Sequence, residues 1–89
     1  MRVEWTDAAL DRLADLFVAA DSTTRETIER CVVGVNAKLA ADPWDLGESR
    51  ATVYRRAWSA QPLFVVFPII PADDLVVVQS VNLLGAKSP

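Results

Sequence analysis

The 89-residue sequence contains no histidine and a single cysteine, Cys31. One cysteine cannot form an intramolecular disulfide, which fits a reducing interior compartment. A cysteine nucleophile needs a base such as histidine, and transition-metal sites use histidine or several thiolates. We therefore predict that Cys31 is a core residue. We expect neither a metal nor a cofactor.

Long apolar runs are also missing. The longest, residues 62–72, is interrupted by prolines and is shorter than the roughly 20 residues that a transmembrane helix needs. The first five residues are charged and lack an apolar signal core. We expect a cytoplasmic protein without a membrane partner.

Apolar residues are nevertheless abundant, at 52% of the chain. A chain of this length makes one domain, here residues 1–89, with only a modest core. We therefore expect apolar surface to remain exposed for a protein partner or for a homo-oligomer.

Charge is unevenly distributed along the chain. Residues 1–49 carry five Lys/Arg against ten Asp/Glu, and residues 50–89 carry four against two. The C-terminal half holds the only basic patch. Four basic residues are weak evidence for nucleic-acid binding, because phosphate affinity requires many Lys/Arg contacts together.

Two helices are predicted after a short strand at residues 2–5. Thr6 can cap the first helix, residues 7–20, and Thr23 with Glu26 fits a capping box for the second. Asp42-Pro43 ends the second helix, and the short turn between the helices predicts an antiparallel hairpin. The expected buried stripes are Leu10, Leu13, Phe17 and Ala20 in the first helix, and Ile28, Cys31, Val32, Val35 and Leu39 in the second.

From residue 51 the apolar period changes to two. Residues 51–59 alternate, residues 63–67 are apolar throughout, as in a central strand covered on both faces, and residues 75–84 form a last strand. Pro68 should end regular pairing. The predicted fold class is α+β, with β-α-α-β-β-β order and the helical hairpin packed on one face of a small antiparallel sheet.

That order resembles the RelE/ParE superfamily of bacterial toxins from type II toxin–antitoxin modules. The resemblance covers about residues 2–84 and rests on order and spacing together. Its local segments are residues 3–9 (VEWTDAA), 39–43 (LAADP), 47–50 (GESR), 55–56 (RR), 62–67 (PLFVVF) and 76–81 (VVVQSV). It implies a cognate antitoxin, which neutralises such toxins by laying a helix or an extended segment over the sheet or the helices.

Three arginines are the first candidate functional residues: Arg50, Arg55 and Arg56. In ribonuclease-type members of the family, basic residues on the middle strands hold the RNA backbone and stabilise charge at the scissile phosphate. Here alternation sends Arg55 and Arg56 to opposite faces. The alternative is that these arginines pair with Glu48 and the acidic helices, or only solvate the sheet.

Aromatic residues form the second set of candidates. Tyr54, on the face of Arg56, could stack on a base or act as a general acid, although a cross-strand packing ladder is the commoner role. Trp44 and Trp58 are candidate partner anchors or core residues. The acidic row on the first helix, Asp7, Asp11 and Asp15, is interpreted as a solvated face rather than a cation site.

The last strand departs from the ribonuclease pattern. The resemblance implies an arginine and a tyrosine or histidine there, whereas residues 79–84 read QSVNLL and Lys87 is the only late base. Three functions stay open. The first is a toxin that binds a target such as DNA gyrase. The second is an endoribonuclease acting on mRNA, free or on the ribosome. The third is a non-toxic homologue that keeps the fold and a partner.

Overall fold

The structure, a computed structural model, describes residues 1–50 and 52–84, without the side chains of residues 50, 52 and 53. The elements, in chain order, are β1 (Arg2–Trp5), α1 (Asp7–Ala19), α2 (Ser22–Ala41), the 3-10 turn η1 (Pro43–Asp45), β2 (Glu48–Arg50), β3 (Thr52–Ala60), β4 (Leu63–Ile70), the 3-10 turn η2 (Pro71–Asp73), β5 (Leu75–Val78) and β6 (Ser80–Leu83). The predicted α+β order is confirmed. The structure adds the short strand β2 and divides the last strand in two. The tail predicted at residues 85–89 lies outside the described residues.

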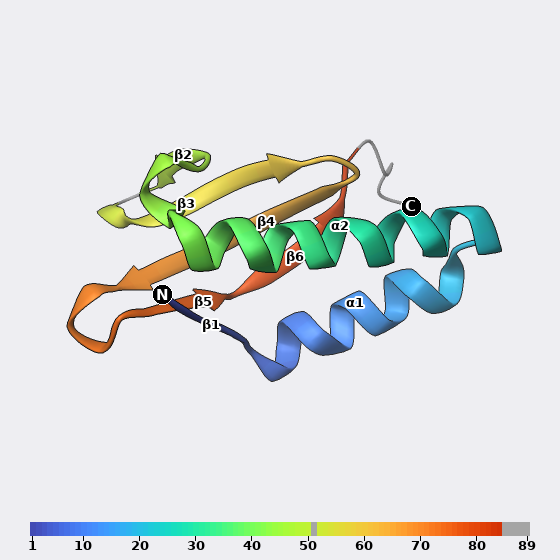
Figure 1. Cartoon of the computed structure of the whole chain (residues 1–89). Helices are drawn as coiled ribbons and strands as arrows, with labels where there is room; N and C mark the ends of the chain where they lie inside the picture. Colours follow the sequence, from blue (N-terminus) through green and yellow to red (C-terminus); the bar gives the residue numbers. More distant parts are fainter. Residues whose placement is uncertain (51, 85–89) are drawn as a thin grey trace.

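The sheet is mixed rather than purely antiparallel (Figure 1). Its strand order is β1-β5-β4-β3-β2, with β6 also paired to β4. β1 runs parallel to β5, with Arg2 opposite Leu75 and Trp5 opposite Val78. The pairs β3–β4, β4–β5 and β4–β6 are antiparallel, as the predicted meander requires. The prediction of an all-antiparallel sheet was wrong at β1, because a pairing across more than 70 residues leaves no local signal in the sequence.

β4 is the central strand of the sheet. One edge of β4 pairs with β3. Within the described residues, the last pair at this edge is Arg55 opposite Pro68. The other edge pairs with β6 and then β5, and the register shifts by one residue between the two. At the shift, the N–H of Gln79 donates to the carbonyl of Val66 at 2.8 Å. Pro68 has no N–H to donate, and the described part of the pairing with β3 reaches no further than Pro68. The prediction that regular pairing ends there was wrong for the other edge, where Ile69 and Ile70 pair with β5.

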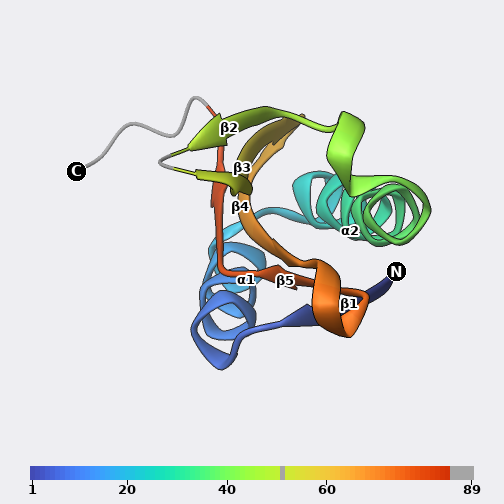
Figure 2. The ribbon, with the colours of Figure 1, turned by 90° about the vertical axis from the view of Figure 1, so that its left-hand side faces the viewer.

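The core lies between the sheet and the two helices. Every second side chain of β4 is fully buried, namely Leu63, Val65, Phe67 and Ile69. The intervening side chains are only half-buried, so the expectation that both faces are covered holds for the helix side alone. Viewed along the helices, the curved sheet has α2 on its inner side and α1 along its β5–β6 margin (Figure 2).

The buried face of α1 differs from the predicted stripe. Ala9 and Leu16 are buried in α1, whereas Leu10 is 48% exposed. In α2 the prediction was better, since Ile28, Val35 and Leu39 are all buried. The first helix carries apolar residues on two neighbouring faces, and only one of them reaches the sheet.

Side chains cap both helices. The hydroxyl of Thr6 accepts the N–H of Ala9 at 3.0 Å, as predicted. The cap of α2 is Asp21 rather than Thr23, because the Asp21 carboxylate accepts the N–H of Thr24 at 2.7 Å and the helix already begins at Ser22. Among the described residues, no helix has the length and hydropathy needed to cross a membrane.

Loss of the Thr6 cap should destabilise the fold. We expect Thr6→Ala to lower the free energy of unfolding by about 1 kcal/mol, because the Ala9 N–H loses its acceptor. Urea denaturation measures the change. The matched control is Thr27→Ala inside α2, where the hydroxyl only donates to the Thr23 carbonyl and alanine favours the helix. An equal loss in both variants would contradict the capping role.

The Asp21 cap should depend on pH. Hydrogen bonds from the N–H and hydroxyl of Thr24 lower the pKa of Asp21. A lowered folded-state pKa contributes stability above the unfolded value of about 3.9, and this is lost as the pH falls through the folded pKa. Asp21→Asn keeps a capping oxygen without the charge. It should be less stable than wild type at about pH 7 and equally stable at about pH 2. Urea midpoints that differ equally at both pH values would contradict this.

Candidate functional site

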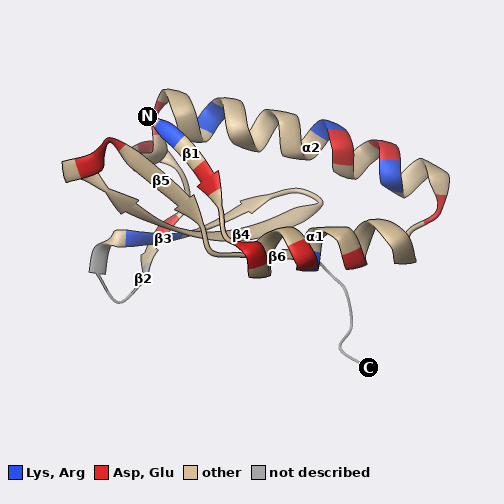
Figure 3. Ribbon diagram, turned by 90° about the horizontal axis from the view of Figure 1, so that it is seen from below, with Lys and Arg blue, Asp and Glu red and all other residues tan. Residues whose placement is uncertain are grey.

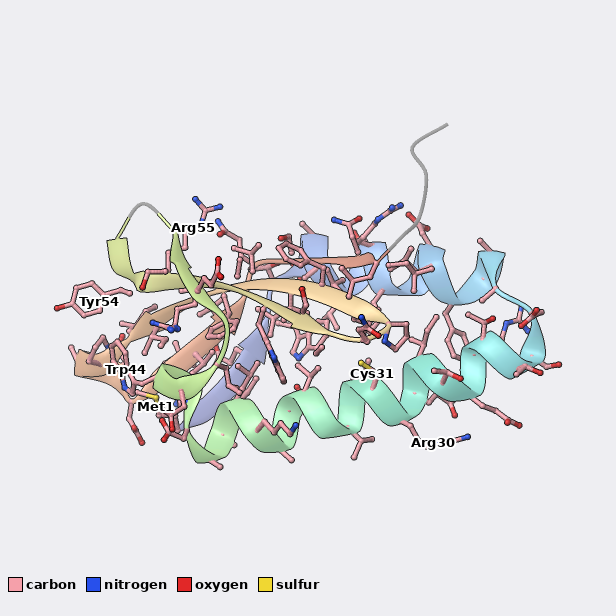
Figure 4. The ribbon with its side chains drawn as sticks, turned by 90° about the horizontal axis from the view of Figure 1, so that it is seen from above. Met1, Arg30, Cys31, Trp44, Tyr54 and Arg55 are labelled. Atoms are coloured by element: carbon pink, nitrogen blue, oxygen red, sulfur yellow. The ribbon has the colours of Figure 1, made fainter. Side chains whose placement is uncertain are left out.

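Arg55 and Arg56, neighbours on β3, lie on opposite faces of the sheet, as predicted. Arg56 lies opposite Phe67 and Arg55 opposite Pro68, and directly paired residues on antiparallel strands share a face. Phe67 belongs to the core, so Arg56 faces the helix side. Arg55 is exposed and points away from α2 (Figure 4).

Arg56 holds the loop before β2 in place. Its Nε donates to the carbonyl of Leu46 at 2.7 Å, Nη2 to the carbonyl of Gly47 at 3.1 Å, and Nη1 to the hydroxyl of Ser49 at 3.3 Å. These partners differ from the acidic ones weighed for the structural alternative. With all three nitrogens donating to the loop, Arg56 has a structural role in this conformation.

Gly47 lets that loop approach β3 closely. Its φ is +64°, a left-handed conformation that L side chains rarely adopt. A Cβ at this position would lie 2.1 Å from the carbonyl oxygen of Ala57, a backbone atom that cannot move aside. Gly47 and Arg56 together hold β2 against β3.

Arg55 is the one candidate arginine with an exposed, described side chain. Arg50 ends β2, and its side chain lies outside the described residues. Arg55 makes no hydrogen bond or ion pair with another described residue. It shares the outer face of the sheet with Ser59, Phe64 and Val66. A single guanidinium with these neighbours can contact a phosphate or a carboxylate, but they offer it no partner for proton transfer.

Tyr54 lies on the other side of β3 from Arg55. Its ring meets Trp44 of η1 edge-on, with centroids 6.0 Å apart and planes at 69°. Both rings remain accessible, at 51% for Tyr54 and 40% for Trp44. Figure 4 shows these two rings together at one end of the molecule, near Met1. The structure therefore brings Tyr54 to Trp44 and separates it from Arg55.

Trp58 and Cys31 lie where β3 faces α2. Both are half-buried against the core, so Cys31 is less enclosed than predicted. Its thiol donates to the carbonyl of Ala60 at 3.0 Å, and burial raises the pKa of Cys31 and keeps it protonated. The ammonium of Lys38 lies 5.8 Å from the centre of the Trp58 ring, as a cation–π contact.

The acidic row of α1 is exposed, as interpreted from the sequence. Asp7, Asp11 and Asp15 are all exposed. Figure 3 shows the acidic positions spaced along α1 in red. Within residues 1–50 and 52–84, no three acidic, histidine or cysteine side chains gather as a metal site would require.

An apolar groove, here called the helix groove, lies between α1 and α2. Its volume is about 600 Å³. Its lining residues are Leu10, Leu13, Ala14, Phe17, Val18, Ile28, Glu29, Val32 and Val33. Val18 is 75% exposed and Val33 70%. The apolar excess of the sequence indicated such a surface, but its position depended on which faces of the helices the sheet covers.

Three solved structures resemble the chain over nearly its whole length. A chromosomal ParDE toxin–antitoxin system from P. aeruginosa matches with a TM-score of 0.70 at 13% identity, covering 93% of this chain and 95% of that one. The isolated E. coli RelE toxin matches with a TM-score of 0.61 at 17% identity, covering 98% and 87%. The intact E. coli RelBE toxin–antitoxin complex matches with a TM-score of 0.59 at 18% identity, covering 98% of each chain.

No protein-family model matches the chain, and no curated protein is significantly similar to it in sequence. The structural matches, together with the element order, define the class. The chain has the fold of the RelE/ParE toxins.

The two arginines of β3 should respond differently to the same substitution. Arg56→Lys should lower the free energy of unfolding by about 2 kcal/mol, because lysine cannot replace three donors fixed in one plane. Arg55→Lys should change it by less than about 0.5 kcal/mol. Urea denaturation of both variants measures the difference. Equal stabilities would show that the Arg56 hydrogen bonds do not hold the loop.

Proposed function

We propose that the protein is the toxin component of a type II toxin–antitoxin module and that a cognate antitoxin neutralises it. The observation that carries the proposal is the helix groove on a chain with the toxin fold. About 600 Å³ of apolar groove, lined by exposed Leu10, Val18 and Val33, is costly to leave in water. A partner that covers it gains the free energy of that burial.

The charges beside the helix groove indicate what kind of partner fits. Asp7 and Asp11 lie on the exposed side of α1, one helical turn from Leu10 and Ala14, and Glu29 lines the α2 wall. A helix with an apolar stripe and basic flanks complements this surface. A second copy would bring acidic rims together, so the rims favour an antitoxin over a homo-oligomer at this surface.

The proposed toxin acts by binding a target rather than by cutting RNA. General acid–base catalysis requires the proton-transfer group within hydrogen-bond reach of the reacting atoms. Strand alternation puts Arg55 on one face and Tyr54 on the other, and Arg56 is already engaged by the loop. A protein target such as DNA gyrase needs no catalytic group. Cleavage of mRNA remains the competing activity and would depend on Arg55.

Growing bacteria can show whether the protein is toxic and whether toxicity depends on Arg55. Induction of the protein alone should arrest growth, and Arg55→Ala should relieve the arrest at equal soluble abundance, because Arg55 is the exposed basic group of the outer face. Arg12→Ala, another exposed arginine that bonds to Asn82, is the charge-matched control and should stay toxic. Normal growth with abundant soluble wild type would favour a non-toxic homologue.

The helix groove can be tested by co-expression with the product of the neighbouring gene. Val33→Lys should keep the toxicity of the free protein but escape neutralisation, because covering the charge with the apolar stripe of a partner costs desolvation energy and its positive sign repels the basic flanks. Ala37→Lys is the control, at an exposed residue of α2 that does not line the groove. Equal neutralisation of both variants would place the antitoxin elsewhere.

A further inference from the structure

A second cleft lies on the other flank of α2, between that helix and the end of β3. Its volume is about 520 Å³, and Cys31, Gly34, Lys38, Trp58 and Gln61 are among its lining residues. It shares no lining residue with the helix groove. Figure 4 shows Cys31 on the strand side of α2, where this cleft opens.

Of the described residues that line the cleft, Lys38 alone carries a charged group. Among the described residues the one ion pair joins Arg2 to Glu4, so no described carboxylate lies within ion-pair distance of Lys38. The contact with Trp58 holds the ammonium over the ring, at the wall of the cleft. Cys31 adds no negative charge, because its thiol is protonated and donates to the carbonyl of Ala60. The cleft is therefore net positive and partly apolar.

Gly34 keeps the cleft open at the helix backbone. A Cβ added to Gly34 would meet nothing within 4 Å, so the fold itself does not require glycine there. Glycine is the least favourable helix residue after proline, so this position costs helix stability without improving the packing. What glycine does provide is a bare stretch of α2 that another backbone can approach closely.

We propose that this cleft binds an acidic segment of a partner polypeptide. A carboxylate of the segment pairs with Lys38, and a neighbouring apolar side chain lies over Gly34 against the ring of Trp58. The α2 residues that line the cleft span about two helical turns, from Cys31 to Lys38, which suits an extended chain, and the charge of the cleft is complementary to an acidic one. The cleft lies on the opposite flank of α2 from the helix groove, and the helix groove suits a basic segment instead.

The probes are the blocked peptides acetyl-Phe-Glu-Phe-amide and acetyl-Phe-Gln-Phe-amide, with benzoate as a free carboxylate. The readout is the indole N–H signal of Trp58 in a ¹H–¹⁵N spectrum, with the signals of Trp5 and Trp44 as internal references. The Glu peptide should shift Trp58 alone. The Gln peptide should bind about threefold to fivefold more weakly, as expected for loss of one exposed ion pair.

Variants of α2 complete the test. Lys38→Gln should weaken binding of the Glu peptide to the affinity of the Gln peptide. Arg30→Gln makes the same charge change on the outer side of α2 (Figure 4) and should leave that affinity unchanged. Gly34→Leu should abolish the shift by filling the cleft. Gly34→Ala should weaken binding, because its methyl group lies where the segment packs, while raising the Tm by about 4 °C. Thermal melts confirm that each variant folds.

Three results would overturn the proposal. Equal binding of the Glu and Gln peptides would show that the carboxylate contributes nothing and that the contact is apolar only. Equal weakening by Lys38→Gln and Arg30→Gln would make it an effect of net charge. Benzoate binding as tightly as the Glu peptide would reassign the cleft to small carboxylates.

Discussion

The pairing of β4 with strands on both of its edges is the constraint on which the rest of the protein depends. β3 lies on one edge and β5 and β6 on the other, so every other β4 side chain is enclosed between the sheet and the helices. Phe67, Val65 and Leu63 have no exposed surface. Because burial of apolar area is the main stabilising term in a domain of this size, the helices must pack where these side chains point.

The same constraint leaves apolar surface unburied. Ala9 and Leu16 fix the face of α1 that reaches the sheet, and the neighbouring face, with Leu10 and Val18, is left toward solvent beside α2. This exposed apolar face is the surface that the proposed partner would cover.

Strand alternation also decides what the basic residues can do. Arg55 and Arg56 are neighbours in sequence, yet one faces solvent on the outer face and the other is bonded to the loop before β2. Tyr54 is held by Trp44 on the Arg56 side. A catalytic site would need these groups to converge, whereas a binding surface can use Arg55 by itself.

The amino-acid sequence by itself determined the element order, the Thr6 cap, the buried face of α2 and the opposite orientations of Arg55 and Arg56. These depend on spacing and on side chains within a few residues of one another. The tertiary structure decided the parallel pairing of β1 with β5, the rotation of the α1 stripe and the roles of Arg56 and Gly47. The physical reason is that these features depend on contacts between residues far apart in the chain, where local periodicity carries no information about which face is covered.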